Sequence, residues 1–181
     1  MSDRTTPAHF AAAWAADTRA PLPRVGDERE ILTASLDWHR ATFELKCAGL
    51  TPEQLSRRSV AASGLSLHGL LRHLAGVERW WFRIQYAGAD VPLLYYSDED
   101  PEQDFEQLDG NVDEAFAVWH RECARSREIV AGAAFDDTGR LRTTGEAVSL
   151  RRVVVTVLTE YARHDGHADL LRESIDGATG H

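Results

Sequence analysis

Apolar residues recur at intervals of three and four along four stretches of this chain, which is the spacing that one face of an α-helix requires. The stretches cover residues 27–49, 66–88, 111–132 and 149–177. Each begins at an aspartate, asparagine or serine, residue types that cap helix N-termini, and each ends at or near a glycine. No stretch alternates apolar and polar residues as a half-buried strand does. The pattern therefore predicts four long helices and an all-α fold.

Four helices with one apolar face each can bury those faces against one another, so the predicted architecture is a four-helix bundle. The connection between the second and third helices, residues 88–111, is long and rich in charged and turn-forming residues, which allows a crossover. A short helix is expected after Thr51, where Pro52 and Gln54 complete a capping pattern. Residues 135–148 are expected to form a loose hairpin or a plain loop, and no function is assigned to them.

Residues 1–26 are predicted to form an N-terminal arm that packs on the bundle, because Pro21 and Pro23 prevent a helix from continuing through this segment. Residues 27–180 then form the bundle itself, and 181 residues are enough for one domain with a substantial core. The apolar run at residues 10–16 is short and has no basic segment before it, so it is not typical of a signal peptide.

Some side chains have expected places in this bundle. Aromatic residues bury large areas, so four of them are expected to fill the core and not to line a pocket: Trp80, Trp81, Phe82 and Trp119. His68 is expected at the solvated start of its helix, and His39 and His120 in core hydrogen bonds. The acidic residues 98–103 are expected to be a solvated connection, since they contain a proline and lack the glycine of a calcium-binding loop.

Charge and cysteine content narrow the class of partner. The 20 Lys and Arg residues against 29 Asp and Glu give a formal net charge of -9, and the basic residues are scattered, so nucleic acid is not an expected partner. Cys47 and Cys123 lie far apart in sequence, which suggests neither a disulfide framework nor a thiol-based metal site and fits a reducing cytoplasm. No run approaches the roughly 20 apolar residues of a membrane span.

Three residues of the second and fourth helices form a candidate metal site. Glu160 and His164 are four residues apart, so both side chains lie on one face of their helix and can reach one ion. His73 borders the apolar stripe of the second helix and would supply a third ligand from the facing side. Such a set suits zinc, nickel or another first-row divalent ion and leaves a coordination position open for water or a thiol.

Simpler interpretations of the same residues remain open. A histidine on a helix is usually a core or surface residue with one hydrogen bond. Glu160 and His164 can also pair only with each other. His167, on the same side of the helix, is expected to support a ligand or to contact a substrate.

Two segments of the chain, residues 65–81 and 160–173, resemble the DinB/YfiT-like superfamily. Together with the loop at residues 96–101 they resemble, more narrowly, its actinobacterial mini-circle-protein subfamily. The resemblance extends over nearly everything between residues 25 and 180. It implies a four-helix bundle with a long crossover between the second and third helices, and a metal ion held by three residues, often three histidines.

The metal-binding histidine of the family's second helix falls on His73, and its fourth-helix pair falls on Glu160 and His164. A glutamate therefore stands where the family often has a histidine. This His-Glu-His set is similar to that in the N-terminal domain of the mycothiol-dependent maleylpyruvate isomerases, which bind zinc. Those isomerases carry a second domain that this chain lacks, so isomerase activity is not expected.

The resemblance also implies a function, because characterised relatives include thiol transferases that use mycothiol or bacillithiol. The leading hypothesis is a metal-dependent thiol S-transferase with mycothiol as cosubstrate, acting on a small electrophile. The alternative is a non-catalytic metal- or small-ligand-binding protein of the stress response, in which the ion mainly ties two helices together. A homodimer is expected through the resemblance alone.

Overall fold

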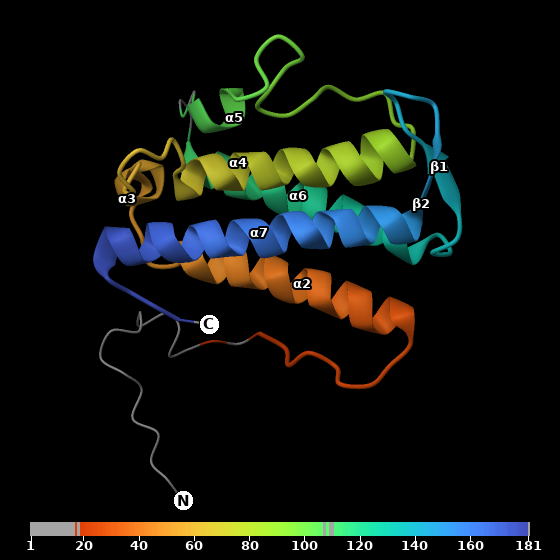
Figure 1. Ribbon diagram of the computed structural model, residues 1–181, viewed down its shortest axis with the longest axis horizontal. Coiled ribbons are helices and arrows are strands. Elements are labelled where there is room, and N and C mark those ends of the chain that lie inside the picture. The colour runs from red at the N-terminus through yellow and green to blue at the C-terminus, as the bar shows by residue number, and fades with distance from the viewer. Residues whose placement is uncertain (1–16, 18, 107, 109–110, 181) are drawn as a thin grey trace, which may run out of the picture.

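The computed structural model describes residues 17, 19–106, 108 and 111–180, and within them four long helices lie side by side (Figure 1). They are α2 (Glu28–Cys47), α4 (Leu67–Glu78) with its continuation η1 (Arg79–Tyr86), α6 (Val112–Ala131) and α7 (Leu150–Asp176). The shorter elements are α3 (Pro52–Ser56), α5 (Gln103–Glu106), β1 (Thr138–Arg140) and β2 (Ala147–Ser149). The predicted mainly helical fold, a bundle with a long crossover between its second and third long helices, is confirmed.

Helix boundaries follow the capping residues that the sequence provides. The side chain of Asp27 accepts a hydrogen bond from the backbone of Glu30 at 2.8 Å, and Ser149 caps α7 in the same way. Thr51 and Gln54 form the expected reciprocal capping box at the start of α3. Helix α7 ends at Gly177, whose φ of 76° is a left-handed conformation that glycine adopts without strain.

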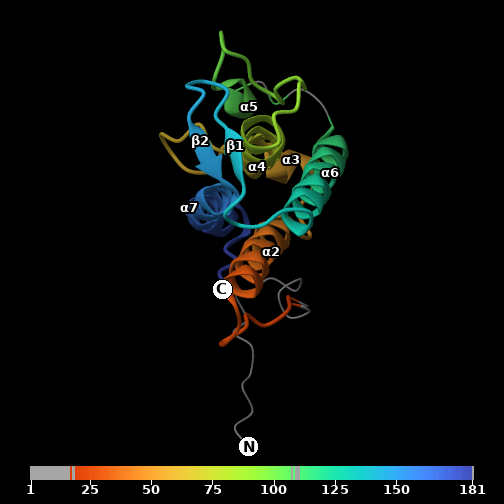
Figure 2. The same cartoon turned by 90° about the vertical axis from the view of Figure 1, so that its right-hand side faces the viewer.

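The bundle core lies where the apolar faces of the long helices meet (Figure 2). Helix α2 packs on α7, and α4 packs on both α6 and α7. Each helix contributes fully buried side chains to this core, among them Phe43, Leu70, Leu74, Trp119, Val157 and Tyr161. Helix α4 is thus central to the bundle, and its side chains face two neighbours at once.

A charged pair is buried within the same core. The guanidinium of Arg40 on α2 donates to both carboxylate oxygens of Glu78 on α4, at 2.8 and 2.7 Å. A further hydrogen bond joins Arg40 to Asp37 at 2.8 Å. Burial alone would raise the pKa of Glu78, but the positive charge of Arg40 reverses this effect and holds that pKa below its ordinary value. The pair is therefore ionised and closed off from solvent.

The second long helix changes type after Glu78. Residues Arg79–Tyr86 form a π-helix, with the backbone of Ala87 bonded to the carbonyl five residues earlier, on Phe82, at 3.0 Å. The sequence predicts a continuous α-helix here, so this part of the prediction is wrong. A π-turn holds more residues than an α-turn, and it turns consecutive side chains through a smaller angle.

Residues 98–103 of the crossover form a largely exposed connection, as predicted. The parts of the crossover on either side of them are seated on α4, through Tyr96 and Phe105. Two glycines on one side of α4 allow this contact. A side chain at Gly69 would come within 3.3 Å of Phe105, and one at Gly76 within 3.2 Å of the Tyr96 ring. The carboxylate of Asp104 is almost fully buried in this contact. The aromatic residues of the crossover therefore lie directly against the helix backbone.

Residues 138–149 contain the predicted hairpin: β1 and β2 pair antiparallel, with Gly139 opposite Val148. The hairpin lies at one end of the bundle (Figure 1) and packs on η1. A Cβ at Gly139 would fall 2.1 Å from the carbonyl oxygen of Tyr86, a distance that no side chain tolerates. Strand β1 therefore touches the backbone at the end of the π-helix.

Only the end of the predicted N-terminal arm is described, since residues 1–16 lie outside the described part of the chain. There the guanidinium of Arg19 lies 4.6 Å from the ring centre of Trp38 and donates to Thr42 at 2.6 Å. The division into residues 1–26 and 27–180 remains a prediction. Among the described helices, none combines the length and apolar character that crossing a membrane requires.

Candidate metal centre

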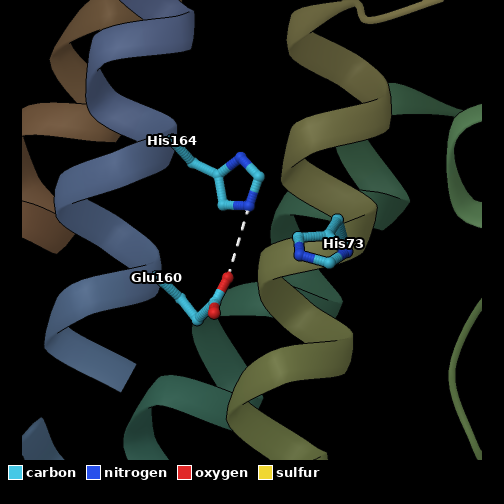
Figure 3. Close-up of side chains that lie close together, drawn as sticks. All are labelled: His73, Glu160 and His164. Carbon is cyan, nitrogen blue, oxygen red and sulfur yellow. Dashed lines mark ion pairs between the residues drawn. The ribbon is translucent and has the colours of Figure 1, made fainter. Parts of the chain in front are cut away.

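The three predicted ligands lie together between α4 and α7. His73, Glu160 and His164 each offer one ligand atom, and these atoms all lie within 4.8 Å of one another. Figure 3 shows the imidazole of His73 on one helix facing the two side chains of the other. We call these three residues the histidine–glutamate cluster. Of the described residues, this is the group whose spacing would hold a metal ion.

Local helix geometry and bundle packing produce the cluster together. On α7 the four-residue spacing brings Oε2 of Glu160 to 3.5 Å from Nε2 of His164. Packing of α4 on α7 then brings the His73 ring to a centroid distance of 4.7 Å from the His164 ring. A third side chain with a possible ligand atom therefore lies next to the Glu160–His164 pair.

The three side chains offer ligand atoms of the types that bind divalent ions, and one separation between these atoms matches that in a metal site. Imidazole and carboxylate ligands bind first-row metals at about 2.0–2.2 Å, which places tetrahedral ligand atoms roughly 3.4 Å apart. The 3.5 Å between Glu160 and His164 matches this separation. Two nitrogens and one oxygen from protein suit zinc or nickel and leave a coordination position for another molecule.

Asp104 holds His73 in place, and sequence reasoning missed it. Its Oδ2 lies 2.8 Å from Nδ1 of His73, and the carboxylate comes from α5 in the crossover. Asp104 is only 2% exposed, and its Oδ1 has no other hydrogen-bond partner among the described residues. The contact commits Nδ1 of His73 to the carboxylate, which leaves Nε2 as the nitrogen for a metal ion.

His164 is held in a form that can bind a metal. Burial lowers its pKa to about 3, and the neighbouring imidazoles of His73 and His167 add to the effect. The ring is therefore neutral at physiological pH, with a lone pair available. Nδ1 of His167 lies 3.2 Å from Nδ1 of His164. His167 therefore contacts a predicted ligand, which is one of the two roles expected from the sequence.

A pocket of about 290 Å³ opens beside the cluster. Its lining combines two members of the cluster with aromatic, apolar and acidic residues of α4, η1 and the crossover: His73, Val77, Trp80, Trp81, Tyr96, Pro101, Glu102, Asp104, Phe105 and Glu160. Burial and the nearby carboxylate of Asp104 raise the pKa of Tyr96 to about 12, so its hydroxyl keeps its proton. The pocket can therefore receive an apolar molecule next to the predicted open coordination position.

The tryptophan prediction is wrong for two of the four aromatic residues. Phe82 and Trp119 are buried in the core as expected. Trp80 and Trp81 are only half-buried and line the pocket instead, although Trp81 also packs against the core. Both follow Val77 at intervals of three and four residues, as Val77 follows His73, so they lie on the same side of the helix as these other lining residues.

The remaining histidines differ partly from expectation. His39 makes the predicted hydrogen bond, to Asp165 at 2.7 Å. His120 does not belong to the core: its side chain is 52% exposed and pairs with Glu44 at the surface. His68 is only 2% exposed and hydrogen-bonds to Ser56, so the prediction of a solvated position is wrong. The short helix α3 covers this end of α4.

Comparison with known proteins agrees with this arrangement. The family model described as mycothiol S-transferase matches residues 31–177, a range that includes α4 with η1, α6 and α7 completely, all of α2 except its first residues, and every member of the cluster. That family is DinB/YfiT-like, so the superfamily resemblance of the sequence is confirmed. A search of curated proteins found no match. With most of its length matched by one family model, the chain belongs to the mycothiol S-transferase family.

Proposed function

We propose that this protein is a divalent-metal-dependent thiol S-transferase with mycothiol as its thiol substrate. The observation that carries the proposal is the histidine–glutamate cluster, whose three donors converge beside an aromatic pocket. A purely structural metal site is normally closed by four protein ligands, whereas a catalytic site keeps one position open. Membership of the mycothiol S-transferase family supports the choice of thiol.

The reaction joins the sulfur of the thiol to an electrophilic carbon. In a substitution, the S–H bond and the carbon–leaving-group bond break, a C–S bond forms, and the proton leaves with the departing group. When bound here, a divalent cation would lower the pKa of a thiol, so that the nucleophilic thiolate is present near neutral pH. His73, Glu160 and His164 would hold that cation in place.

The other residues of the site have roles that follow from their contacts. Asp104 fixes the ring of His73 through Nδ1. The ring of Phe105 stacks on His73, with centroids 4.9 Å apart, and covers one side of it. Trp80 and Trp81 form an apolar wall that binds the electrophile and excludes water from the reacting atoms.

A turnover assay tests the proposal directly. Purified protein with added zinc or nickel is mixed with 1-chloro-2,4-dinitrobenzene and with mycothiol, bacillithiol or glutathione. We expect thioether formation above the uncatalysed rate, fastest with mycothiol. His73→Ala should reduce kcat/KM at least about 100-fold, because loss of a supporting contact alone typically costs 10–100-fold. Elemental analysis of protein purified without added metal identifies the ion.

His120→Ala is the matched control for that variant. It also removes an imidazole, but from an exposed pair on α6 that lies outside the cluster and the pocket. Its rate should equal that of the wild type. Equal rates for His73→Ala and wild type, or no turnover with any of the three thiols, would reject the proposed function. The expected homodimer and cytoplasmic location stay predictions, for which sedimentation and cell fractionation are the measurements.

A further inference from the structure

The charge of the pocket beside the cluster bears on which electrophile the protein accepts. Among the described residues that line it, three carry carboxylates, Glu102, Asp104 and Glu160, and none is a lysine or arginine. Arginine and lysine are the side chains that normally recognise carboxylate or phosphate groups on a ligand. The described side chains that line the pocket therefore offer no counter-ion to an anionic substrate.

A metal ion and a thiolate bound at the cluster would not make the net charge of the pocket positive. A divalent cation adds two positive charges, the three carboxylates supply three negative charges, and a thiolate adds a fourth. The formal sum stays negative in the state in which the reaction would occur. Asp104 is 2% exposed, so solvent screens its charge weakly, whereas Glu102 lies exposed at the rim. An anionic group in the pocket would thus face like charge from both the buried and the exposed side.

The remaining walls favour a flat apolar molecule. Trp80 and Trp81 come from the π-helix, and the rings of Tyr96 and Phe105 come from the crossover seated on α4. A volume of about 290 Å³ lies at the small end of the range for ligand pockets, which suits one substituted ring. Offset or edge contacts with aromatic side chains would hold such a ring.

We propose that the pocket selects small, uncharged or cationic aromatic electrophiles and discriminates against anionic ones. This inference deepens the proposed function and rests on it for the identity of the reaction. The pocket's preference for charge is a binding property, however, and can be measured without turnover. The two hypotheses can therefore fail separately.

The test compares two unreactive ligands that differ in one carboxylate, 1,3-dinitrobenzene and 3,5-dinitrobenzoate, by isothermal titration calorimetry on the full chain freed of metal by a chelator, because a carboxylate is itself a metal ligand. We expect the neutral compound to bind at least about tenfold more tightly. Glu102→Arg should bring the two affinities at least about threefold closer, because it replaces a negative charge at the rim by a positive one. Glu106→Arg makes the same charge change on α5 outside the pocket lining and should leave the ratio near that of the wild type.

Each possible result supports or overturns the proposed charge preference of the pocket. Equal affinities in the wild type, tighter binding of the anion, or binding of neither compound would overturn it. An equal change of the ratio in Glu102→Arg and Glu106→Arg would also overturn it, since the effect would then come from the overall charge of the protein. A preference for the neutral compound in a protein without turnover would reject only the proposed function. A preference together with turnover supports both.

Discussion

Two groups of polar side chains lie between the helices, and they are built in opposite ways. In the first, Arg40 and Glu78 join α2 to α4 through two hydrogen bonds, and both side chains are at most 5% exposed. In the second, the histidine–glutamate cluster joins α4 to α7, with donors near one another and a pocket beside them. Glu78 and His73 lie on the same helix, so one helix contributes to both.

The difference lies in how charge is compensated. Glu78 has a cation within hydrogen-bond distance, which offsets the cost of burying its carboxylate. The cluster has no cationic side chain among its three members and instead gathers lone pairs at one point, which is the environment that a metal ion would fill. Compensation of charge within the protein therefore distinguishes the Arg40–Glu78 pair from the cluster that we propose binds a metal ion.

The largest effect is expected from Arg40→Ala. It leaves the carboxylate of Glu78 buried without its cation, which should lower the free energy of unfolding by about 3–5 kcal/mol. Urea denaturation followed by circular dichroism measures the loss. The double variant Arg40→Met with Glu78→Leu removes both charges and should recover most of the stability. A stable single variant would show that the pair contributes little to the fold.

The matching change in the cluster is His73→Ala. Its ring is partly exposed, but it is the hydrogen-bond partner of the buried Asp104 carboxylate, so the metal-free stability should fall by about 1–3 kcal/mol, less than in Arg40→Ala. Zinc affinity should fall at least about 100-fold, and the rise in Tm that zinc gives the wild type should disappear. Calorimetric titration and thermal melts with and without zinc measure both. Unchanged zinc affinity would contradict the proposed ligand set.

Asp104→Asn should have a smaller effect on the same site. The amide can still accept a hydrogen bond from Nδ1 of His73, but it lacks the negative charge, so we expect zinc affinity to fall about 10–100-fold. Asp98→Asn changes a carboxylate of the same crossover outside the pocket lining and serves as the control. Equal affinities for both variants would show that Asp104 does not support the metal site.

In the metal-free protein, His164 and Glu78 should each make the stability depend on pH, in different pH ranges. The pKa of His164 is lowered from 6.5 to about 3, so between these values the unfolded chain binds the proton and the folded chain does not. Stability is therefore lost as the pH falls below 6.5, by up to about 1.4 kcal/mol per pH unit from this group. The pKa of Glu78 is lowered below 4.5, so its contribution is present above that pH and lost below it.

Variants separate these two ranges. His164→Gln should flatten the dependence of unfolding free energy on pH between 6.5 and 4.5, and the Arg40→Met, Glu78→Leu double variant should flatten it below 4.5. Denaturant titrations at half-unit pH steps make the comparison. Identical pH profiles for wild type and His164→Gln would contradict the assignment of the upper range.

The sequence alone predicted those parts of the site that depend on local spacing. Glu160 and His164 share a helix face because of their four-residue separation, and the apolar stripe containing His73 required α4 to face another helix. Asp104 was not predictable in this way, since its position depends on how the crossover settles on Gly69 and Gly76. A pair of glycines seven residues apart on a helix with an apolar face was the one available signal.

The main errors concern side chains whose exposure depends on neighbouring elements of the fold. Trp80 and Trp81 were expected in the core because aromatic side chains bury large areas, whereas both are half-buried and line the pocket. His68 was expected in solvent because it is near a helix start, but α3 covers it. Periodicity identifies the face of a helix, and it cannot show which other segment will cover that face.

The contact between Gly139 and the backbone of Tyr86 gives the hairpin an unexpected importance. A π-helix is equivalent to an α-helix with one inserted residue, and shortening Arg79–Tyr86 by one position would restore the regular winding. Such a deletion would rotate the helix residues that follow it relative to His73, which precedes it. Deletion of one residue would therefore change which side chains of η1 face the substrate, provided that the hairpin shifted with it.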